Sequence, residues 1–190
     1  MPTPPPSQQP SQPSQPGRFQ QFLNLFFKSQ PSQPPEFTIR RATTGDIAAL
    51  LNLLDALAAF DRQFDTSLDP NYNRSEEGLA WLRATLEDKD ALVLIATGAA
   101  PLGMLFGRLE GVEPWRDNGS ILAELEMLYI AEGARGTGIG RHLTNAFAQW
   151  AREHGAVRLW VRASAANAGA LRFYHREAFE DYDVILERKL

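Results

Sequence analysis

The sequence predicts an α/β (α+β) fold in which one mixed β-sheet is flanked by helices in the order β-α-α-β-β-β-α-β-α-β. Two kinds of segment alternate along the chain. In one, apolar and polar residues alternate, as in strands, and in the other, apolar residues recur at helical spacing. Two early strands are separated by only three residues, which indicates an antiparallel hairpin, whereas helices join the later strands, which indicates parallel pairing. With 190 residues and 44% hydrophobic content, the chain can form one core and carry a tail.

Residues 1–36 are expected to form a disordered tail. They contain ten of the 13 prolines, in Pro/Gln/Ser repeats with too few apolar side chains to offset the entropy of ordering. Within the tail, segment 18–29 is amphipathic, because four of its apolar residues share one helical face: Phe19, Phe22, Leu23 and Phe26. This segment either docks on its own domain or binds a partner or a membrane surface. Residues 37–190 are expected to be the single folded domain.

The domain is expected to begin with one strand and two helices. Residues 37–43 alternate between apolar and polar side chains, as in a half-buried strand. The next segment, 43–61, has apolar residues at helical spacing and starts at Thr44 or Asp46, both of which suit a helix N-cap. A second helix over 75–88 starts at its first residue, a serine, for the same reason.

The middle of the domain is expected to be a hairpin followed by a third strand. Residues 91–97 and 101–111 are apolar segments joined by a Gly-Ala-Ala connection, which favours an antiparallel pair. A polar turn over 112–120 then leads to the strand 121–130.

The last part of the domain alternates helices with strands. A helix over 138–155 ends at Gly155, and the strand 156–164 follows it. A helix over 170–179 then leads to a final strand over 181–190. Helix-linked strands of this kind pair in parallel.

Composition excludes several classes of function. The chain has 19 basic and 23 acidic residues and no dense Lys/Arg cluster, so nucleic acid is not an expected partner. It has no cysteine and only three scattered histidines, so no metal site is expected. The longest apolar run of the N-terminal region is too short for a secretory signal or a membrane span. The expected location is cytoplasmic.

A glycine-rich turn opens the helix near residue 138. The N-terminus of a helix has unpaired backbone N–H groups and a partial positive charge, which together form an anion site. Gly136, Gly138 and Gly140 remove the side chains that would keep a pyrophosphate away from those groups. Arg135 and Arg141 flank the turn as cations. The alternative is a turn that only allows the helix and strand to pack closely.

Two familiar phosphate-binding motifs do not fit this turn. The spacing from Gly133 to Gly138 suits a P-loop, but Ile139 stands where that motif requires lysine. A dinucleotide fingerprint, G-x-G-x-x-G, requires a third glycine at its sixth position. That position is Arg141 if the motif starts at Gly136 and Leu143 if it starts at Gly138.

The turn and a second motif resemble those of the GNAT superfamily of acetyl-CoA-dependent N-acetyltransferases. The family's pyrophosphate pattern is Arg or Gln, two residues, Gly, one residue, and Gly or Ala, and the chain matches it over Arg135, Gly136, Thr137, Gly138, Ile139 and Gly140. The second motif is matched by Asn167, Ala170, Phe173, Tyr174 and Phe179. The resemblance covers residues 37–190 and implies a GNAT-like sheet.

One position departs from the second motif. Ala178 stands where the family usually has glycine. Alanine adopts a left-handed helix end less readily than glycine does, so a different turn geometry is expected after the helix.

The resemblance implies a direct attack of a primary amine on the thioester carbonyl of acetyl-CoA. An alkylamine has a pKa of about 10.4 and must lose a proton before it attacks, so a carboxylate is needed as base. Glu126 occupies the position of that base in several family members, and Glu124 is the reserve because period two puts it on the same strand face. The alternative is that these residues are ordinary polar positions of a sheet.

The resemblance also implies the remaining groups of the site. A backbone N–H at about Leu128, beside a β-bulge, would stabilise the oxyanion, and the pantetheine arm would pair with Leu128, Tyr129 and Ile130. Asn167 would contact the cofactor. Tyr174 would donate a proton to the leaving thiolate, since a phenol of pKa about 10 stays protonated at neutral pH. Its alternative role is that of a packed aromatic residue.

The segment 58–74 is expected to face the acceptor. It carries three acidic and three aromatic residues, which suit a cationic amine: Asp61, Asp65, Asp69, Phe60, Phe64 and Tyr72. A solvated capping loop is the alternative. A small-molecule amine is the expected acceptor, a protein N-terminus or lysine is the second hypothesis, and a non-enzymatic acyl-CoA sensor is the third. Whether the chain forms a homodimer stays open.

Overall fold

The computed structural model describes residues 36–111 and 120–188 of the chain. The amphipathic segment 18–29 and nearly all of the polar turn 112–120 therefore lie outside the described residues. So does almost the whole of the expected tail.

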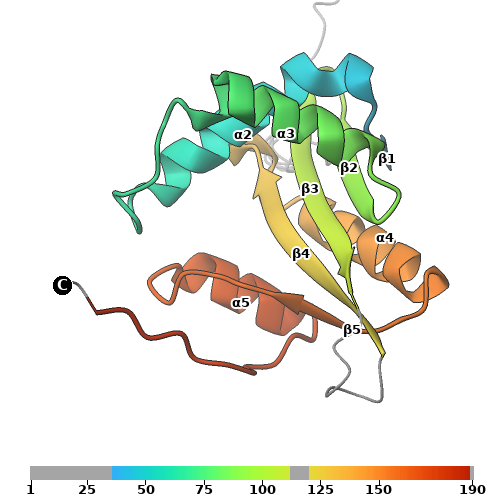
Figure 1. Ribbon diagram of the computed structural model, residues 1–190, viewed down its shortest axis with the longest axis vertical. Coiled ribbons are helices and arrows are strands. Elements are labelled where there is room, and N and C mark those ends of the chain that lie inside the picture. Colours follow the sequence, from blue (N-terminus) through green and yellow to red (C-terminus); the bar gives the residue numbers. More distant parts are fainter. Residues whose placement is uncertain (1–35, 112–119, 189–190) are drawn as a thin grey trace, which may run out of the picture. The chain divides into compact units, whose positions relative to one another are not determined.

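The described residues form one five-stranded sheet in the order β1-β2-β3-β4-β5 (Figure 1). Its strands are β1 (Thr38–Arg41), β2 (Ala91–Thr97), β3 (Pro101–Glu110), β4 (Ile121–Ile130) and β5 (Ala156–Val161). The first four strands pair antiparallel, and β4 pairs with β5 in parallel. The expected hairpin is confirmed, and so is the parallel pairing expected for the two strands that α4 joins. The mixed sheet follows from the connections, because a short turn joins β2 to β3 while α4 joins β4 to β5.

Helices cover both faces of the sheet. On one face, α2 (Ile47–Asp61) and α3 (Glu76–Glu87) bury leucines against β2 and β3. On the other face, α4 (Ile139–Glu153) buries Ile139, Leu143 and Phe147. The last helix, α5 (Ala168–Arg176), follows β5, and short 3-10 turns lie at Thr44–Asp46, Tyr72–Arg74 and Glu132–Ala134. In the described part of the chain, none of the helices combines the length and apolar character that crossing a bilayer requires.

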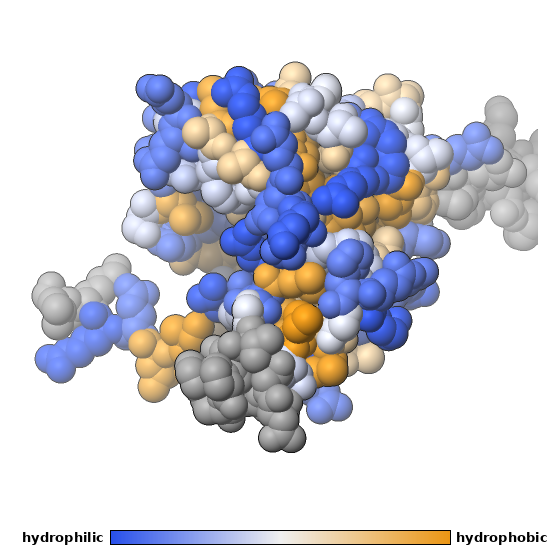
Figure 2. All heavy atoms as spheres, turned by 45° about the vertical axis from the view of Figure 1, so that its right-hand side comes forward, coloured by the Kyte–Doolittle hydropathy of each residue, from blue (hydrophilic) through white to orange (hydrophobic). Residues whose placement is uncertain are grey.

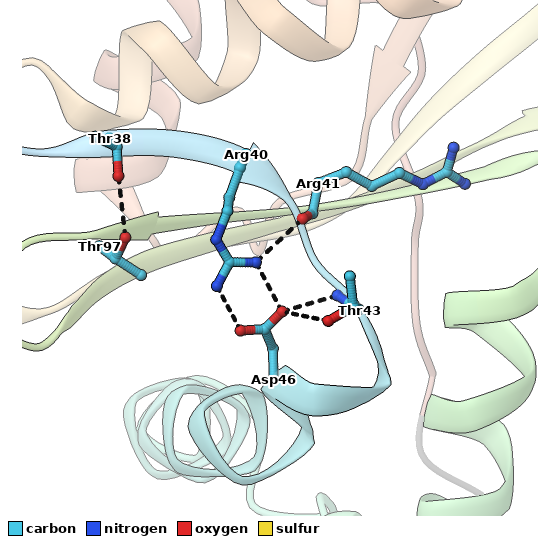
Figure 3. Close-up of polar contacts among 6 residues, drawn as sticks. All are labelled: Thr38, Arg40, Arg41, Thr43, Asp46 and Thr97. Atoms are coloured by element: carbon cyan, nitrogen blue, oxygen red, sulfur yellow. Dashed lines mark hydrogen bonds and ion pairs between the residues drawn. The ribbon is translucent and has the colours of Figure 1, made fainter.

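Polar contacts fix the start of α2 against β1 (Figure 3). The Arg40 guanidinium donates to both carboxylate oxygens of Asp46, at 2.8 and 2.6 Å, and the same carboxylate accepts from the backbone N–H and hydroxyl of Thr43. These donors hold the pKa of Asp46 well below its usual range. The start of α3 is capped as expected, since the Ser75 hydroxyl oxygen accepts from the N–H of Gly78 at 3.0 Å.

A β-bulge interrupts β4 at Glu126. Met127 lies opposite Phe106 and Leu125 lies opposite Gly107, so Glu126 has no partner on β3. The extra residue changes which side chains face α4: Ala123 and Leu125 do so before the bulge, and Leu128 and Ile130 do so after it. The resemblance implied a bulge at about Leu128, and the structure has it two residues earlier, at Glu126.

The expected final strand over 181–190 is wrong for the residues that the structure describes. Residues 181–188 leave α5 as an extended chain without a hydrogen-bonded ladder to any strand (Figure 1). Strand-like composition creates a tendency to pair, but pairing also requires a neighbouring edge at the right distance. In the described chain, β5 is therefore the last strand.

Gly107 is required by close packing between β3 and α4. A Cβ at this position would collide with the fully buried ring of Phe147 and would lie 2.7 Å from the carbonyl oxygen of Glu124. We expect Gly107→Ala to lower the free energy of unfolding by about 1–3 kcal/mol, because backbone and a packed ring must both move. Urea denaturation measures this, with Gly111→Ala as the control, since nothing lies within 4 Å of a Cβ there. Equal stability of the two variants would contradict the packing argument.

Candidate active site

The sheet opens between β4 and β5. Their parallel pairing ends where Leu125 lies opposite Val161, whereas β4 continues to Ile130 (Figure 1). Beyond the bulge, β4 therefore has no β5 partner along this edge. A cavity of about 760 Å³ occupies the opening and is lined by the second half of β4, the end of α2, the start of α4, and α5. An extended ligand can lie along such an exposed strand edge and hydrogen bond to it.

The glycine turn forms one wall of this cavity. Gly136 and Gly138 have φ angles of 79° and 90°, which other residues rarely adopt, and Gly138 directly precedes the first residue of α4. Position 140 requires glycine for a different reason: a Cβ there would lie 3.1 Å from the ring of Phe173 on α5. The turn thus presents the N-terminus of a 15-residue helix to the cavity without side chains in between.

The structure brings most of the predicted cofactor residues to this cavity. Those that line it are Leu128, Tyr129, Ile130, Arg135, Gly136, Gly138, Ile139, Gly140, Arg141 and Asn167. Thr137 is not among the lining residues, and its hydroxyl donates to the carbonyl oxygen of Ala134 at 2.7 Å. That bond tightens the turn from within.

Three of these residues also make contacts within the protein. The side chain of Asn167 caps α5 by accepting from the N–H of Ala170 at 3.0 Å. Arg141 pairs with Glu177 at 3.3 Å. Arg135 donates to the carbonyl oxygen of Ile130 at 3.2 Å, and its guanidinium lies 5.1 Å from the centre of the Phe60 ring. Arg135 thus links the glycine turn to the end of α2.

Glu126 and Glu124 have different environments. Glu126, the bulged residue, lines the cavity, and one of its carboxylate oxygens lies 3.9 Å from Nε of Arg108. Partial burial raises the pKa of Glu126, and the charge of Arg108 offsets part of that rise. Glu124 is buried, does not line the cavity, and pairs with Arg162 at 3.3 Å. Both carboxylates lie on one face of β4, as period two predicts, because Arg108 lies opposite Glu124 and also approaches Glu126, but only Glu126 lines the cavity.

Tyr174 lies in the cavity wall on α5. Its ring packs edge-on against Phe173 and Phe179, at centroid distances of 5.2 and 5.4 Å. Burial, with a contribution from the charge of Asp61, raises the pKa of Tyr174 to about 12. The phenol is therefore both packed and protonated at neutral pH.

The turn after α5 differs from the expectation for Ala178. Ala178 adopts the left-handed conformation, with a φ of 64°, that glycine would adopt at a helix end. The N–H of Phe179 donates to the carbonyl oxygen of Tyr174 at 3.0 Å and closes the turn. The expected change of geometry is thus wrong: Ala178 takes the conformation of the usual glycine, and the hydrogen bond and ring contact between Tyr174 and Phe179 accompany it.

The end of α2 and the loop after it form the wall opposite α5. Four of the six acidic and aromatic residues expected to face an acceptor line the cavity: Phe60, Asp61, Phe64 and Asp65. Asp69 and Tyr72 do not line it. Burial raises the pKa of Asp61. This acidic and aromatic wall, together with Glu126, suits a cationic group.

Sequence reasoning missed Arg162 and Ser164, which line the cavity just after β5. The general rule that ligands bind at the carboxyl ends of strands, where neighbouring strands diverge, could have found them. Within residues 36–111 and 120–188, no group of three or more His, Asp or Glu side chains is placed to hold a metal ion.

Comparisons with known proteins agree on one family. The model of the acetyltransferase (GNAT) family matches residues 53–179 of the chain. An uncharacterised N-acetyltransferase of Methanocaldococcus jannaschii is 26% identical over 180 residues, which are 89% of this chain and 74% of that protein. A streptothricin acetyltransferase of Streptomyces lavendulae is 37% identical over 94 residues, which are 49% of this chain and 47% of that protein.

A solved structure shares the fold. An aminoglycoside N-acetyltransferase in complex with CoA superposes with a TM-score of 0.65 and 17% identity, covering 82% of this chain and 95% of that chain. At that identity the likeness concerns the fold alone.

Proposed function

Because the chain belongs to the acetyltransferase (GNAT) family, we propose that it transfers an acetyl group from acetyl-CoA to a primary amine by direct attack in a ternary complex. The family and the N-acetyltransferase relatives make it an acyltransferase enzyme that acetylates amines. The donor, the acceptor and the catalytic residues belong to the proposal. The observation that carries it is one cavity that joins the glycine turn, the open edge of β4, Glu126 and Tyr174.

The donor site is proposed on the α4 and β4 side of the cavity. The N-terminus of α4, without side chains at Gly136 and Gly138, suits the pyrophosphate of acetyl-CoA. The edge of β4 after the bulge suits the amide groups of the pantetheine arm, because it has no β5 partner there. The CoA complex of the aminoglycoside N-acetyltransferase that shares the fold supports this donor.

The proton transfers are assigned to residues that line the same cavity. We assign Glu126 as the base that removes a proton from the acceptor ammonium, directly or through water, so that the nitrogen can attack the thioester carbon. A backbone N–H of β4 near Leu128 would donate to the oxyanion. As the carbon–sulfur bond breaks, Tyr174 would give its phenolic proton to the CoA thiolate. The phenol holds this proton at neutral pH until the thiolate forms.

The acceptor is proposed to be a small molecule with a cationic amine. Asp61, Asp65 and Glu126 supply negative charge, and the rings of Phe60 and Phe64 lie 5.6 Å apart beside them. The streptothricin and aminoglycoside acetyltransferases among the similar proteins are named for small-molecule substrates, which supports this class. A cytoplasmic location stays a prediction from the sequence.

Thiol release from acetyl-CoA tests the proposed activity. The panel should contain polyamines, amino sugars, amino acids, and peptides with a free N-terminus or a lysine, with the acceptor-free reaction as the blank. Turnover with a small amine, and intersecting rate plots when both substrates vary, are expected. A preference for peptides would favour a protein acceptor. Acetyl-CoA binding without turnover on any amine would favour a sensor and contradict the proposal.

Glu126→Gln tests the base. We expect kcat/KM at neutral pH to fall by about 10²–10⁴-fold, because the amide cannot accept a proton. In the wild type, kcat/KM should fall with decreasing pH as Glu126 becomes protonated, at a pH above the ordinary glutamate pKa because its pKa is raised. The pH profile of Glu126→Gln should lack this acidic limb, in which kcat/KM falls with decreasing pH. At high pH its kcat/KM should recover, because the amine then loses its proton without a base.

Glu124→Gln is the matched control for this variant. It removes a carboxylate from the same strand that lies outside the cavity, and it should keep the acidic limb of the pH profile. A raised pKa means that folding disfavours the charged form of Glu126, so Glu126→Gln should not lose stability at neutral pH. If Glu124→Gln removed the limb and Glu126→Gln kept it, the assignment would be reversed.

A further inference from the structure

Helices α2 and α3 cover only part of the sheet face on which they pack. Along β3, the side chains of Met104 and Phe106 are fully buried under these helices. Arg108 is the next residue on the same face, and its side chain is 42% exposed. Figure 2 shows hydrophilic side chains, coloured blue, gathered across the middle of the view, at the height where the sheet emerges from under the two helices in Figure 1. The sheet face thus changes from apolar to charged between Phe106 and Arg108.

Arg108 lies between two carboxylates. Its Nη2 donates to Oδ2 of Asp88 at 2.8 Å, whereas its Nε lies 3.9 Å from Oε1 of Glu126. The first distance is that of a hydrogen bond, and the second is too long for one. Arg108 therefore binds Asp88 and acts on Glu126 through its charge.

Asp88 is itself held at the end of α3. It is the first residue after that helix, and its Oδ1 accepts from the N–H of Asp90 at 2.9 Å. The guanidinium of Arg41 on β1 donates to the backbone carbonyl oxygens of Asp88, at 3.4 Å, and Ala91, at 2.9 Å. One carboxylate oxygen of Asp88 is thus bound to backbone, and the other binds Arg108. Asp88 is a fixed tether for the arginine.

Several charged groups surround Glu126. Burial raises the pKa of Glu126, and the charge of Arg108 opposes that rise. Three neighbouring carboxylates add to the rise: Glu124, Glu110 and Asp88. Other titratable groups line the same cavity, namely Asp61 and Asp65 opposite α5, Arg135 of the glycine turn, Arg162 after β5, and Tyr174 on α5. Arg108 is therefore the cation that offsets the neighbouring carboxylates.

A carboxylate that acts as a base has two conflicting requirements. It must be charged at neutral pH, which a nearby cation favours. It must also keep an oxygen free for the incoming proton, and a direct hydrogen bond from a guanidinium would occupy that oxygen and lower its affinity for the proton. The arrangement around Arg108 meets both requirements, because its positive charge is close to Glu126 while its short hydrogen bond goes to Asp88.

We propose that Arg108, tethered by Asp88, is a positioning residue for Glu126: it keeps the carboxylate charged and leaves the carboxylate oxygens free to accept a proton. Neither Arg108 nor Asp88 lines the cavity, so both act through Glu126. This role rests on the proposed function, in which Glu126 takes a proton from the acceptor.

The pH dependence of kcat/KM tests the role of Arg108. Arg108→Gln should move the acidic limb to higher pH by about 0.5–1 pH unit, the shift that a unit charge about 4 Å away produces at the dielectric constant of water. At high pH its kcat/KM should approach that of the wild type, because Glu126 itself is intact. Arg108→Lys keeps the positive charge and should leave the limb near its wild-type pH.

Asp88→Asn tests the tether and should have the opposite effect. It removes a negative charge and releases Arg108 to bind Glu126 directly, so the acidic limb should move to lower pH. The maximal kcat/KM should fall, because the guanidinium then occupies the oxygens of the base. Arg40→Gln is the matched control, since Arg40 pairs with Asp46 at 2.6 Å and neither residue lines the cavity. It loses an ion pair of the same kind and should keep the wild-type limb.

Carbon-13 NMR gives a readout that does not need turnover. The side-chain carboxyl resonance of Glu126, assigned by its loss in Glu126→Gln, follows the protonation of this residue in the protein without substrates. Its titration should move to higher pH in Arg108→Gln and to lower pH in Asp88→Asn. These shifts would uphold the coupling of Arg108 to Glu126 even if no amine were acetylated, so a failure of the proposed reaction is distinguishable from a failure of this proposal.

Three results would overturn the role of Arg108. The first is an unmoved titration of Glu126 in a folded Arg108→Gln. The second is a shift in the same direction for Arg108→Gln and Asp88→Asn. The third is an equal shift for Arg40→Gln, which would indicate a general loss of structure. Circular dichroism checks folding, and if Arg108→Gln does not fold, the direction of the shift in Asp88→Asn decides.

Discussion

Tyr174→Phe is expected to lower kcat by about 10²–10⁴-fold and to leave the dissociation constant of acetyl-CoA unchanged. The substitution removes one hydroxyl and keeps the ring that packs between Phe173 and Phe179. Loss of the proton donor would slow departure of the thiolate, which is a transition-state effect and leaves ground-state binding intact. Steady-state kinetics and calorimetry of acetyl-CoA binding measure the two quantities separately.

The leaving group gives a sharper test of the same residue. A thioester whose thiol has a low pKa needs no proton to depart, so it should restore much of the lost rate in Tyr174→Phe. Tyr72→Phe is the control, because Tyr72 lies outside the cavity and loses the same hydroxyl. An equal loss of rate for good and poor leaving groups would show that Tyr174 acts through packing.

Gly138→Val is expected to have the largest effect on binding. Valine is strained at a φ of 90°, and its branched side chain would occupy the space in front of the first N–H groups of α4. Each hydrogen bond to a charged pyrophosphate that is lost costs about 1.5–3 kcal/mol, or roughly 10- to 150-fold in the dissociation constant. Isothermal titration calorimetry with acetyl-CoA measures the change.

Gly133→Val is the matched control for the glycine turn. Gly133 lies in the same connection between β4 and α4, but nothing lies within 4 Å of a Cβ there and its φ is not in the left-handed region. Its affinity for acetyl-CoA should stay near that of the wild type. Thermal unfolding must show that Gly138→Val remains folded. A folded Gly138→Val with unchanged affinity would remove the pyrophosphate from this turn.

Local patterns were sufficient to predict most of the fold. The hairpin of β2 and β3, the cap at Ser75 and the turn before α4 each depend on residues within a few positions of one another. The glycine turn, whose residues line the cavity, is likewise predicted by a pattern of residues within a few positions of one another. Strand pairing, in contrast, cannot be predicted from local sequence. The C-terminal residues have the composition of a strand, but only a neighbouring strand edge decides whether they form one.

The bulge in β4 shows what alternation along a single strand cannot predict. Strict alternation puts Glu124 and Glu126 on one face of β4, but after the bulge at Glu126 it shifts by one residue, so that Leu128 and Ile130 face α4 instead of Met127 and Tyr129. A bulge depends on the register between two strands, which no single segment encodes. Arg162 was missed for a related reason, since its place in the cavity depends on where β5 stops pairing with β4.

The acidic wall of the cavity has a consequence for the end of the catalytic cycle. Asp61 and Glu126 attract an acceptor that arrives as a cation, but acetylation turns that amine into a neutral amide. On the proposed chemistry, the attraction that recruits the substrate disappears when the product forms. The same wall then holds the product less strongly than the substrate, so the charge change itself favours turnover and weakens product inhibition.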